Sequence, residues 1–153
     1  MSEQRSFKAP CHYISHRPPM LLLDEVLDGG AQFARCRLTI TPASPFADND
    51  GVPIWVGIEY MAQTIAVYAG LQAELAGEPV KVGFLLGTRR FQSDFAYFQF
   101  GDVVDIEVTE SFAQGDGLSV FSCVVTSSRG VQRAQITVYQ PDDATSILKG
   151  EQR

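Results

Sequence analysis

The segment from Pro53 to Ala76 constrains the fold more than any other part of the chain. As far as Leu71, apolar residues occupy nearly every face that a helix would present, instead of a single stripe. An acidic cluster at 48–50 comes before the segment, and Gly77 and Pro79 come after it, as expected at the two ends of a helix. Because a helix that is apolar all round has to be buried, the rest of the chain is expected to wrap around it.

Segments that alternate apolar and polar residues, the pattern of half-buried strands, lie on both sides of the predicted helix. Strands are expected at 34–40, 104–109 and 133–138, with β-compatible apolar runs at 21–27, 82–86 and 120–125. Short glycine-containing turns, at 101–102, 115–117 and 129–130, favour antiparallel neighbours. This order predicts one domain, residues 1–153, of the α+β class, in which a curved antiparallel sheet encloses one long central helix.

The charge and cysteine content argue against several kinds of function. The chain has 12 Lys+Arg and 18 Asp+Glu, a net charge of −6, so neither a nucleic-acid backbone nor an anionic membrane is expected as the main partner. No apolar segment is long and uninterrupted enough to span a bilayer, and the N-terminus has no apolar signal region. Three widely spaced cysteines fit neither a disulfide framework nor a metal site, which favours a reducing cytoplasm.

Glu59 is the residue of the predicted helix that most suggests chemistry. Glu59 and Gln63 are one turn apart, so they project from the same face, among apolar neighbours. An ionised carboxylate in apolar surroundings is costly unless it is paired, so it is usually protonated, hydrogen-bonded or functional. Burial favours its neutral form, which is the form that a general acid needs. Alternatively, Glu59 only interacts with the helix dipole in the first turn, or points to solvent.

Three motifs stand in order along the chain: HRPPMLLLD at 16–24, GIEYMAQ at 57–63, and GTRRF at 87–91 with Gly101-Asp102 after it. They resemble motifs of the FabZ-type 3-hydroxyacyl-acyl carrier protein dehydratases, which have the hotdog fold, from about residue 16 to residue 141. In that family the Glu of the second motif is catalytic, and the first motif lies near the mouth of the acyl tunnel. HRPPMLLLDEVL, IEYMAQT and the closing YQPDD at 139–143 are closer still to the ApeP-like dehydratases of aryl polyene clusters.

The resemblance implies an enzyme that converts a 3-hydroxyacyl group into its trans-2-enoyl form without a cofactor. The acyl group would be carried on acyl carrier protein through phosphopantetheine. Glu59 would serve as the acid, and also as the base through a water. The chains would associate through their sheets as a homodimer or a higher hotdog oligomer, or as a heterodimer with a second dehydratase.

One catalytic element of the family is missing. FabZ-type enzymes carry a His in an H-F-P-x-x-P segment upstream of the Glu, and the corresponding position here is Pro45, with no His around it. His16 is the better of the two histidines as a replacement base, although it is also expected to shape its loop by hydrogen bonding. Asp48 and Asp50 are further candidates, with helix capping as the alternative role.

Substrate contacts are expected from side chains near the helix start and from arginines. Arginine binds phosphate with a forked geometry, so it suits the phosphopantetheine phosphate or an acidic carrier protein, whereas solvated surface charge is the alternative. Ile54 stands where the family has a Gly whose N–H polarises the thioester carbonyl, and Trp55 is expected to line an acyl channel unless it belongs to the core. The expected substrate-binding residues are Gln63, Ile54, Trp55, Arg17, Arg89 and Arg90.

Two other functions compete with dehydration. The missing His favours a non-catalytic partner, which would keep the fold and bind acyl chains or support an active dehydratase subunit. A hotdog thioesterase would use Glu59 or Asp48 to activate water. Release of free acid would distinguish a thioesterase from a dehydratase, which forms a conjugated double bond.

Overall fold

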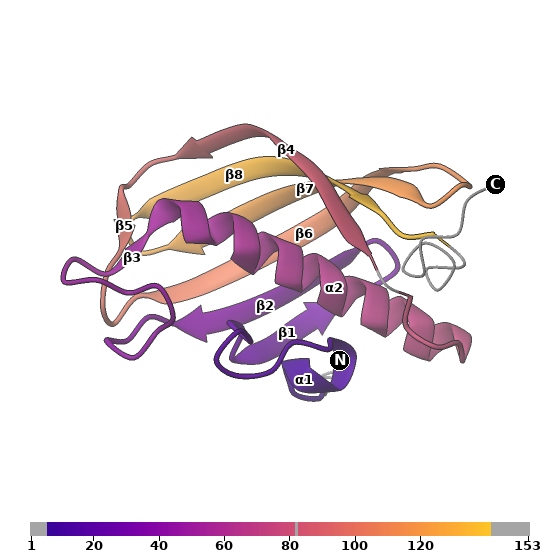
Figure 1. The fold of residues 1–153 in the computed structure, drawn as a ribbon, viewed down its shortest axis with the longest axis horizontal. Helices are drawn as coiled ribbons and strands as arrows, with labels where there is room; N and C mark the ends of the chain where they lie inside the picture. Colours follow the sequence, from indigo (N-terminus) through magenta and orange to yellow (C-terminus); the bar gives the residue numbers. More distant parts are fainter. Residues whose placement is uncertain (1–5, 82, 142–153) are drawn as a thin grey trace, which may run out of the picture.

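The computed structural model describes residues 6–81 and 83–141. Figure 1 shows one long helix lying along a curved sheet. The elements, in chain order, are α1 (Pro10–Tyr13), β1 (Glu25–Gly29), β2 (Phe33–Thr39), β3 (Val52–Pro53), the 3-10 turn η1 (Ile54–Val56), α2 (Gly57–Ala76), β4 (Phe84–Ser93), β5 (Tyr97–Phe98), β6 (Val103–Ala113), β7 (Leu118–Ser127) and β8 (Gly130–Tyr139).

The sheet has six strands in the order β1-β2-β6-β7-β8-β4, and every neighbouring pair is antiparallel. A separate two-stranded ribbon of β3 and β5 lies at the start of α2 (Figure 1). The sheet curves around α2, which confirms the expected hotdog arrangement. Of the two edge strands, β1 has 5 residues and β4 has 10, so β4 presents the longer unpaired edge.

Most strands agree with the expected positions, and the apolar runs at 21–27 and 82–86 differ from them. β6, β7 and β8 contain the segments expected at 104–109, 120–125 and 133–138, and β2 ends at Thr39, one residue before the expected end at Ile40. The run at 21–27 becomes a strand only from Glu25, because Leu22 and Leu23 lie buried in an extended loop over the helix. β4 begins at Phe84 and continues through the GTRRF motif, while residue 82, and residues 142–143 of YQPDD, lie outside the described residues.

The helix begins later than its sequence signals suggest. Pro53 pairs with Tyr97 in the β3–β5 ribbon, and η1 follows it, so α2 starts at Gly57. The acidic cluster does not cap the helix, because the Asp48 side chain accepts a hydrogen bond from Asp50 N (2.7 Å) in its own turn. The end agrees with the prediction: Gly77 adopts a φ of 66°, the left-handed conformation that closes many helices.

Burial of α2 is broad but incomplete, which corrects the expectation of a helix enclosed on every side. Its buried face packs on the sheet through side chains such as Tyr60, Met61 and Val67, all at most 2% exposed. A stripe of residues is only half-buried, at positions one turn apart along the helix: Ile58, Glu59, Ala62, Ala66, Ala69 and Ala73. A single sheet curves around one side of a helix, so this stripe needs another surface to cover it. Within the described residues, no helix is long and apolar enough to cross a membrane.

Candidate active site

Glu59 and His16 approach each other although 42 residues separate them in sequence. Glu59 lies in the first turn of α2, and His16 lies in the loop between α1 and β1. Nε2 of His16 is 3.9 Å from Oε2 of Glu59, which is near enough for both groups to contact one small substrate but too long for a hydrogen bond. The sequence had named both residues, and the fold brings them together.

Gln63 holds this arrangement in place. It is completely buried, and its Nε2 donates to Oε2 of Glu59 (3.0 Å) and to the carbonyl of Met20 (2.8 Å). Its Oε1 accepts a hydrogen bond from Leu22 N (2.9 Å). One amide therefore fixes the carboxylate and two backbone groups of the loop that carries His16. The MAQ motif contained Gln63, but nothing in its spacing indicated a link to residues 20 and 22.

The side chain of Glu59 is less buried than expected. It is 42% exposed because Glu59 lies on the half-buried stripe of α2 and not against the sheet, and the side chain of His16, in the loop beside it, is 35% exposed. Nδ1 of His16 is nevertheless inaccessible and has no hydrogen-bond partner. The His16 ring is thus accessible at Nε2 and buried at Nδ1.

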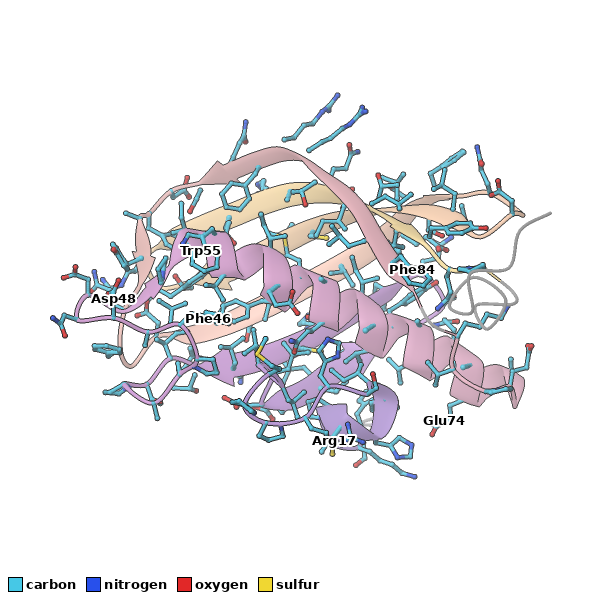
Figure 2. All side chains as sticks on the ribbon, viewed as in Figure 1. Arg17, Phe46, Asp48, Trp55, Glu74 and Phe84 are labelled. Atoms are coloured by element: carbon cyan, nitrogen blue, oxygen red, sulfur yellow. The ribbon has the colours of Figure 1, made fainter. Side chains whose placement is uncertain are left out.

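Arg17 shapes the His16 loop from the other side. Its guanidinium donates to the carbonyls of Ile14 (2.8 Å) and His16 (2.7 Å). Figure 2 shows Arg17 beside α1, well away from Trp55 at the start of α2. These backbone contacts give Arg17 a role in the loop, whether or not it also reaches a substrate.

The start of α2 differs from a free helix N-terminus. The Ile54 N–H donates a hydrogen bond to the carbonyl of Ala96 (3.3 Å), so this donor is already used within the protein. The carbonyl of Ile54 accepts from Nε2 of Gln132 (2.9 Å), which is fully buried. Oε1 of Gln132 lies against Gly57, where an added Cβ would be only 1.8 Å away. A Cβ at position 57 would therefore force the Gln132 side chain to move.

Trp55 and the acidic cluster lie at the outer end of the helix (Figure 2). Trp55 is 59% exposed and makes an edge contact with Phe46, with ring centroids 5.8 Å apart. Asp48, and less directly Asp50, raise the pKa of Tyr97 through their negative charge. In the single chain, Trp55 therefore faces solvent, and the two aspartates lie in an exposed turn.

A cavity of about 240 Å³ lies where residues 21–24 and 41–45 meet the end of β2, and Glu59 is not among its lining residues. It is bordered by Tyr60 on α2 and by Pro45, the position of the missing family His. Burial, with a smaller contribution from the charge of Asp24, raises the pKa of Tyr60 well above its usual value. The remaining lining residues, which sequence reasoning did not single out, are Leu21, Leu22, Asp24, Leu38, Thr39, Thr41, Ala43 and Ser44.

Arg89 and Arg90 lie on β4, where the pairing with β8 shifts register between Arg89 and Gln92. Arg90 has a φ of 56° at this irregularity, and both arginines are exposed. Arg133 on β8 pairs with Gln92 and is also exposed. Among the described residues, the guanidinium groups of these three arginines form no hydrogen bond and no ion pair. We call them the β4–β8 arginine cluster. Within the described residues, no group of three or more His, Cys, Asp or Glu is placed to hold a metal ion.

Comparisons with solved structures agree with this architecture. A chain of the dehydratase heterocomplex ApeI:P from Xenorhabdus doucetiae superposes with a TM-score of 0.85 at 27% identity, covering 96% of this chain and 100% of that chain. The PaaI protein of the E. coli phenylacetic acid degradation operon gives 0.59 at 11% identity, covering 75% and 81%. Cj0977, a sigma28-regulated virulence protein from Campylobacter jejuni, gives 0.55 at 16%, covering 80% and 78%. The last two show the fold alone.

No curated protein matches the chain. The sequence does match the ApeP-like family, described as the ApeP dehydratase, and the match extends over residues 8–149, nearly the whole chain. Together with the hotdog architecture, this match shows that the chain belongs to the ApeP-like dehydratase family.

Proposed function

We propose that this protein dehydrates 3-hydroxyacyl groups carried on acyl carrier protein, as a step in the synthesis of aryl polyene chains. The observation that supports this most directly is the pair of His16 and Glu59, 3.9 Å apart and held by Gln63 at the start of α2. Dehydration removes a proton from C2 of the acyl group and adds one to the hydroxyl leaving C3. C2 and C3 are bonded to each other, so one compact pair of side chains can reach both the proton on C2 and the hydroxyl on C3.

Gln63 acts in this proposal as a positioning residue. Both protons of its amide and its oxygen are already engaged within the protein, so nothing is left for the substrate. Ile54 also acts through the fold, since its N–H and carbonyl are both bonded. The acyl group is expected to extend into the cavity that Tyr60 lines.

The β4–β8 arginine cluster is the proposed contact for the carrier protein. β4, β8 and the next strand, β7, contain no acidic residue, although the chain as a whole has net charge −6. An acidic carrier, or the phosphopantetheine phosphate, would find three unpaired guanidinium groups there. Arg89→Gln with Arg90→Gln should raise KM for a carrier-linked substrate and leave turnover of a pantetheine thioester unchanged. A parallel loss with both substrates would contradict a carrier contact.

We further propose that a second dehydratase chain covers the half-buried stripe of α2. The unpaired edge of β4 is also open, with Leu85 and Leu86 47% and 58% exposed, and suits pairing with another sheet. The similar chain from Xenorhabdus doucetiae belongs to a heterocomplex of dehydratases. The missing His at Pro45 supports the rival proposal, that this chain only supports catalysis by its partner.

The test is mass spectrometry of 3-hydroxyacyl carrier proteins after incubation with the chain, alone and together with a partner dehydratase of the ApeI type. Loss of water from the acyl group is the expected result, and Glu59→Gln should abolish it without lowering the melting temperature, since the amide is nearly isosteric but cannot exchange the proton. Hydrolysis to free acid would favour a thioesterase. Full activity of Glu59→Gln within an active complex would favour the supporting role.

A further inference from the structure

His16 has one buried nitrogen without a partner and one open nitrogen that faces a carboxylate. Nδ1 is inaccessible and makes no hydrogen bond, whereas Nε2 points toward Oε2 of Glu59 at 3.9 Å. A neutral imidazole carries its single proton on one of these two atoms. Where that proton lies decides whether His16 can take a proton from a substrate.

The two placements of the proton are not equivalent. A proton on Nδ1 would bury a donor without an acceptor, which folded proteins rarely tolerate, and would turn the lone pair of Nε2 toward a carboxylate oxygen. A proton on Nε2 instead faces Glu59, and leaves only an acceptor unsatisfied at Nδ1. Both considerations favour the same tautomer. In that tautomer Nε2 has no free lone pair, and the lone pair of Nδ1 is out of reach of any substrate.

We infer that His16 is a neutral hydrogen-bond donor and that the Glu59 carboxyl group alone moves the proton. This inference rests on the proposed dehydration. Oε2 of Glu59 is held by Gln63 at 3.0 Å, and Oε1 forms no hydrogen bond among the described residues, so one oxygen is fixed while the other is available to the substrate.

The step balances without a second base. An oxygen of the Glu59 carboxylate takes the proton from C2, and the electron pair of that C–H bond moves toward the thioester, whose oxygen gains negative charge. Nε2–H of His16 donates a hydrogen bond to this oxygen, as neutral imidazole does in other enzymes that form enolates. That electron pair then forms the C2–C3 double bond, the C3–O bond breaks, and Glu59 gives its proton to the leaving hydroxyl. Water leaves and the carboxylate is restored.

The tautomer can be measured without turnover. Long-range ¹⁵N–¹H correlation spectra of the labelled chain near neutral pH distinguish Nδ1–H from Nε2–H in each imidazole. The chain has only two histidines, and a His12→Gln variant identifies the signals of His16. We expect His16 to be protonated at Nε2 alone. A ring protonated at Nδ1, or at both nitrogens, overturns the inference even if no substrate has yet been found.

Turnover gives an independent test through a graded set of variants. His16→Gln places an amide N–H near the position of Nε2, His16→Asn places one near Nδ1, and His16→Leu removes the donor. None of them can act as a base. If His16 acts as a donor, the turnover number of His16→Gln should stay within about tenfold of the wild-type value, while those of His16→Asn and His16→Leu should fall roughly 10²-fold or more.

Equal losses in all three His16 variants, with unchanged melting temperatures, would show that His16 is the base and overturn the inference. The proposed function fails differently. If the wild-type complex does not dehydrate any 3-hydroxyacyl carrier protein, or if Glu59→Gln remains fully active, then dehydration by Glu59 is wrong, whichever tautomer the spectra show.

Discussion

A single buried amide, that of Gln63, determines where the two candidate catalytic groups lie. Its side chain replaces water for Leu22 N–H and the Met20 carbonyl, and it also holds Glu59. Deleting the amide would leave buried backbone groups without partners, which costs more than the loss of an exposed hydrogen bond.

Gln63→Leu should therefore lower the free energy of unfolding by about 1–3 kcal/mol, and should reduce activity because the His16 loop is released. Gln72→Leu is the matched control: Gln72 lies on the same helix, is half-buried, and donates one hydrogen bond to the carbonyl of Gly30. Urea denaturation of both variants gives the comparison. Equal destabilisation would mean that the clamp adds nothing to an ordinary side-chain hydrogen bond.

The three cysteines should differ sharply in reactivity. Burial raises the pKa of the Cys36 and Cys123 thiols to about 12, whereas Cys11 is exposed. Iodoacetamide at about pH 9 should label Cys11 alone in the folded protein and all three cysteines in urea, because the thiolate is the nucleophile. Mass spectrometry of the digested chain measures this. Rapid native labelling of Cys36 would contradict its burial in the core.

The same shifts predict a pH dependence of stability. Both pKa values are higher in the folded state, so the folded chain keeps two protons that the unfolded chain releases above about pH 8.5. The contribution is complete below that pH and is lost as the pH rises toward 12. The free energy of unfolding should fall over this range, and Cys36→Ala with Cys123→Ala should make the fall shallower. The raised pKa of buried Tyr60 acts in the same direction at the upper end.

At the scale of elements, the first turn of α2 is fixed by its contact with β8. Gly57 has helical backbone angles, so alanine would suit its conformation, but an added Cβ would meet Oε1 of Gln132 at 1.8 Å. Gln132 in turn binds the Ile54 carbonyl just before the helix. The absence of a side chain at Gly57 therefore serves close packing and not backbone freedom.

Gly57→Ala should destabilise the protein by about 1–3 kcal/mol, the usual cost of overpacking, and displace the turn that carries Glu59. Gln132→Ala removes the colliding atom, so the double variant should recover part of the loss. A double-mutant cycle by thermal denaturation measures the coupling. Additive effects would show that the two residues do not share one contact.

At the scale of the whole molecule, the single chain leaves one side of α2 and the edge of β4 open. The half-buried stripe contains mostly alanines, which allow close approach of another surface. β4 adds ten residues of unpaired edge with two exposed leucines. The chain's own sheet covers neither feature, so we expect association at these surfaces.

Leu86→Lys should weaken association of the chain, with itself or with a partner dehydratase, because it places a charge on the open edge. Leu75→Lys is the control, since Leu75 is 69% exposed at the far end of α2. Sedimentation of both variants at micromolar concentration checks the prediction. A wild type that stays monomeric with and without the partner, or equal effects of the two substitutions, would contradict an interface at β4.

Local patterns in the sequence determined the elements and the family. Period-two alternation located three strands and an apolar run located a fourth, the apolar segment before Gly77 located the helix, and the motifs around His16 and Glu59 named the candidate pair. These features depend on neighbouring residues, which the sequence shows directly. Only the tertiary structure decided that Pro53 joins a ribbon, that Gln63 ties Glu59 to the His16 loop, and that Glu59 is open to solvent. Those outcomes depend on contacts between residues tens of positions apart, on the curvature of the sheet, and on which side of α2 it covers, and none of these is encoded in a local period.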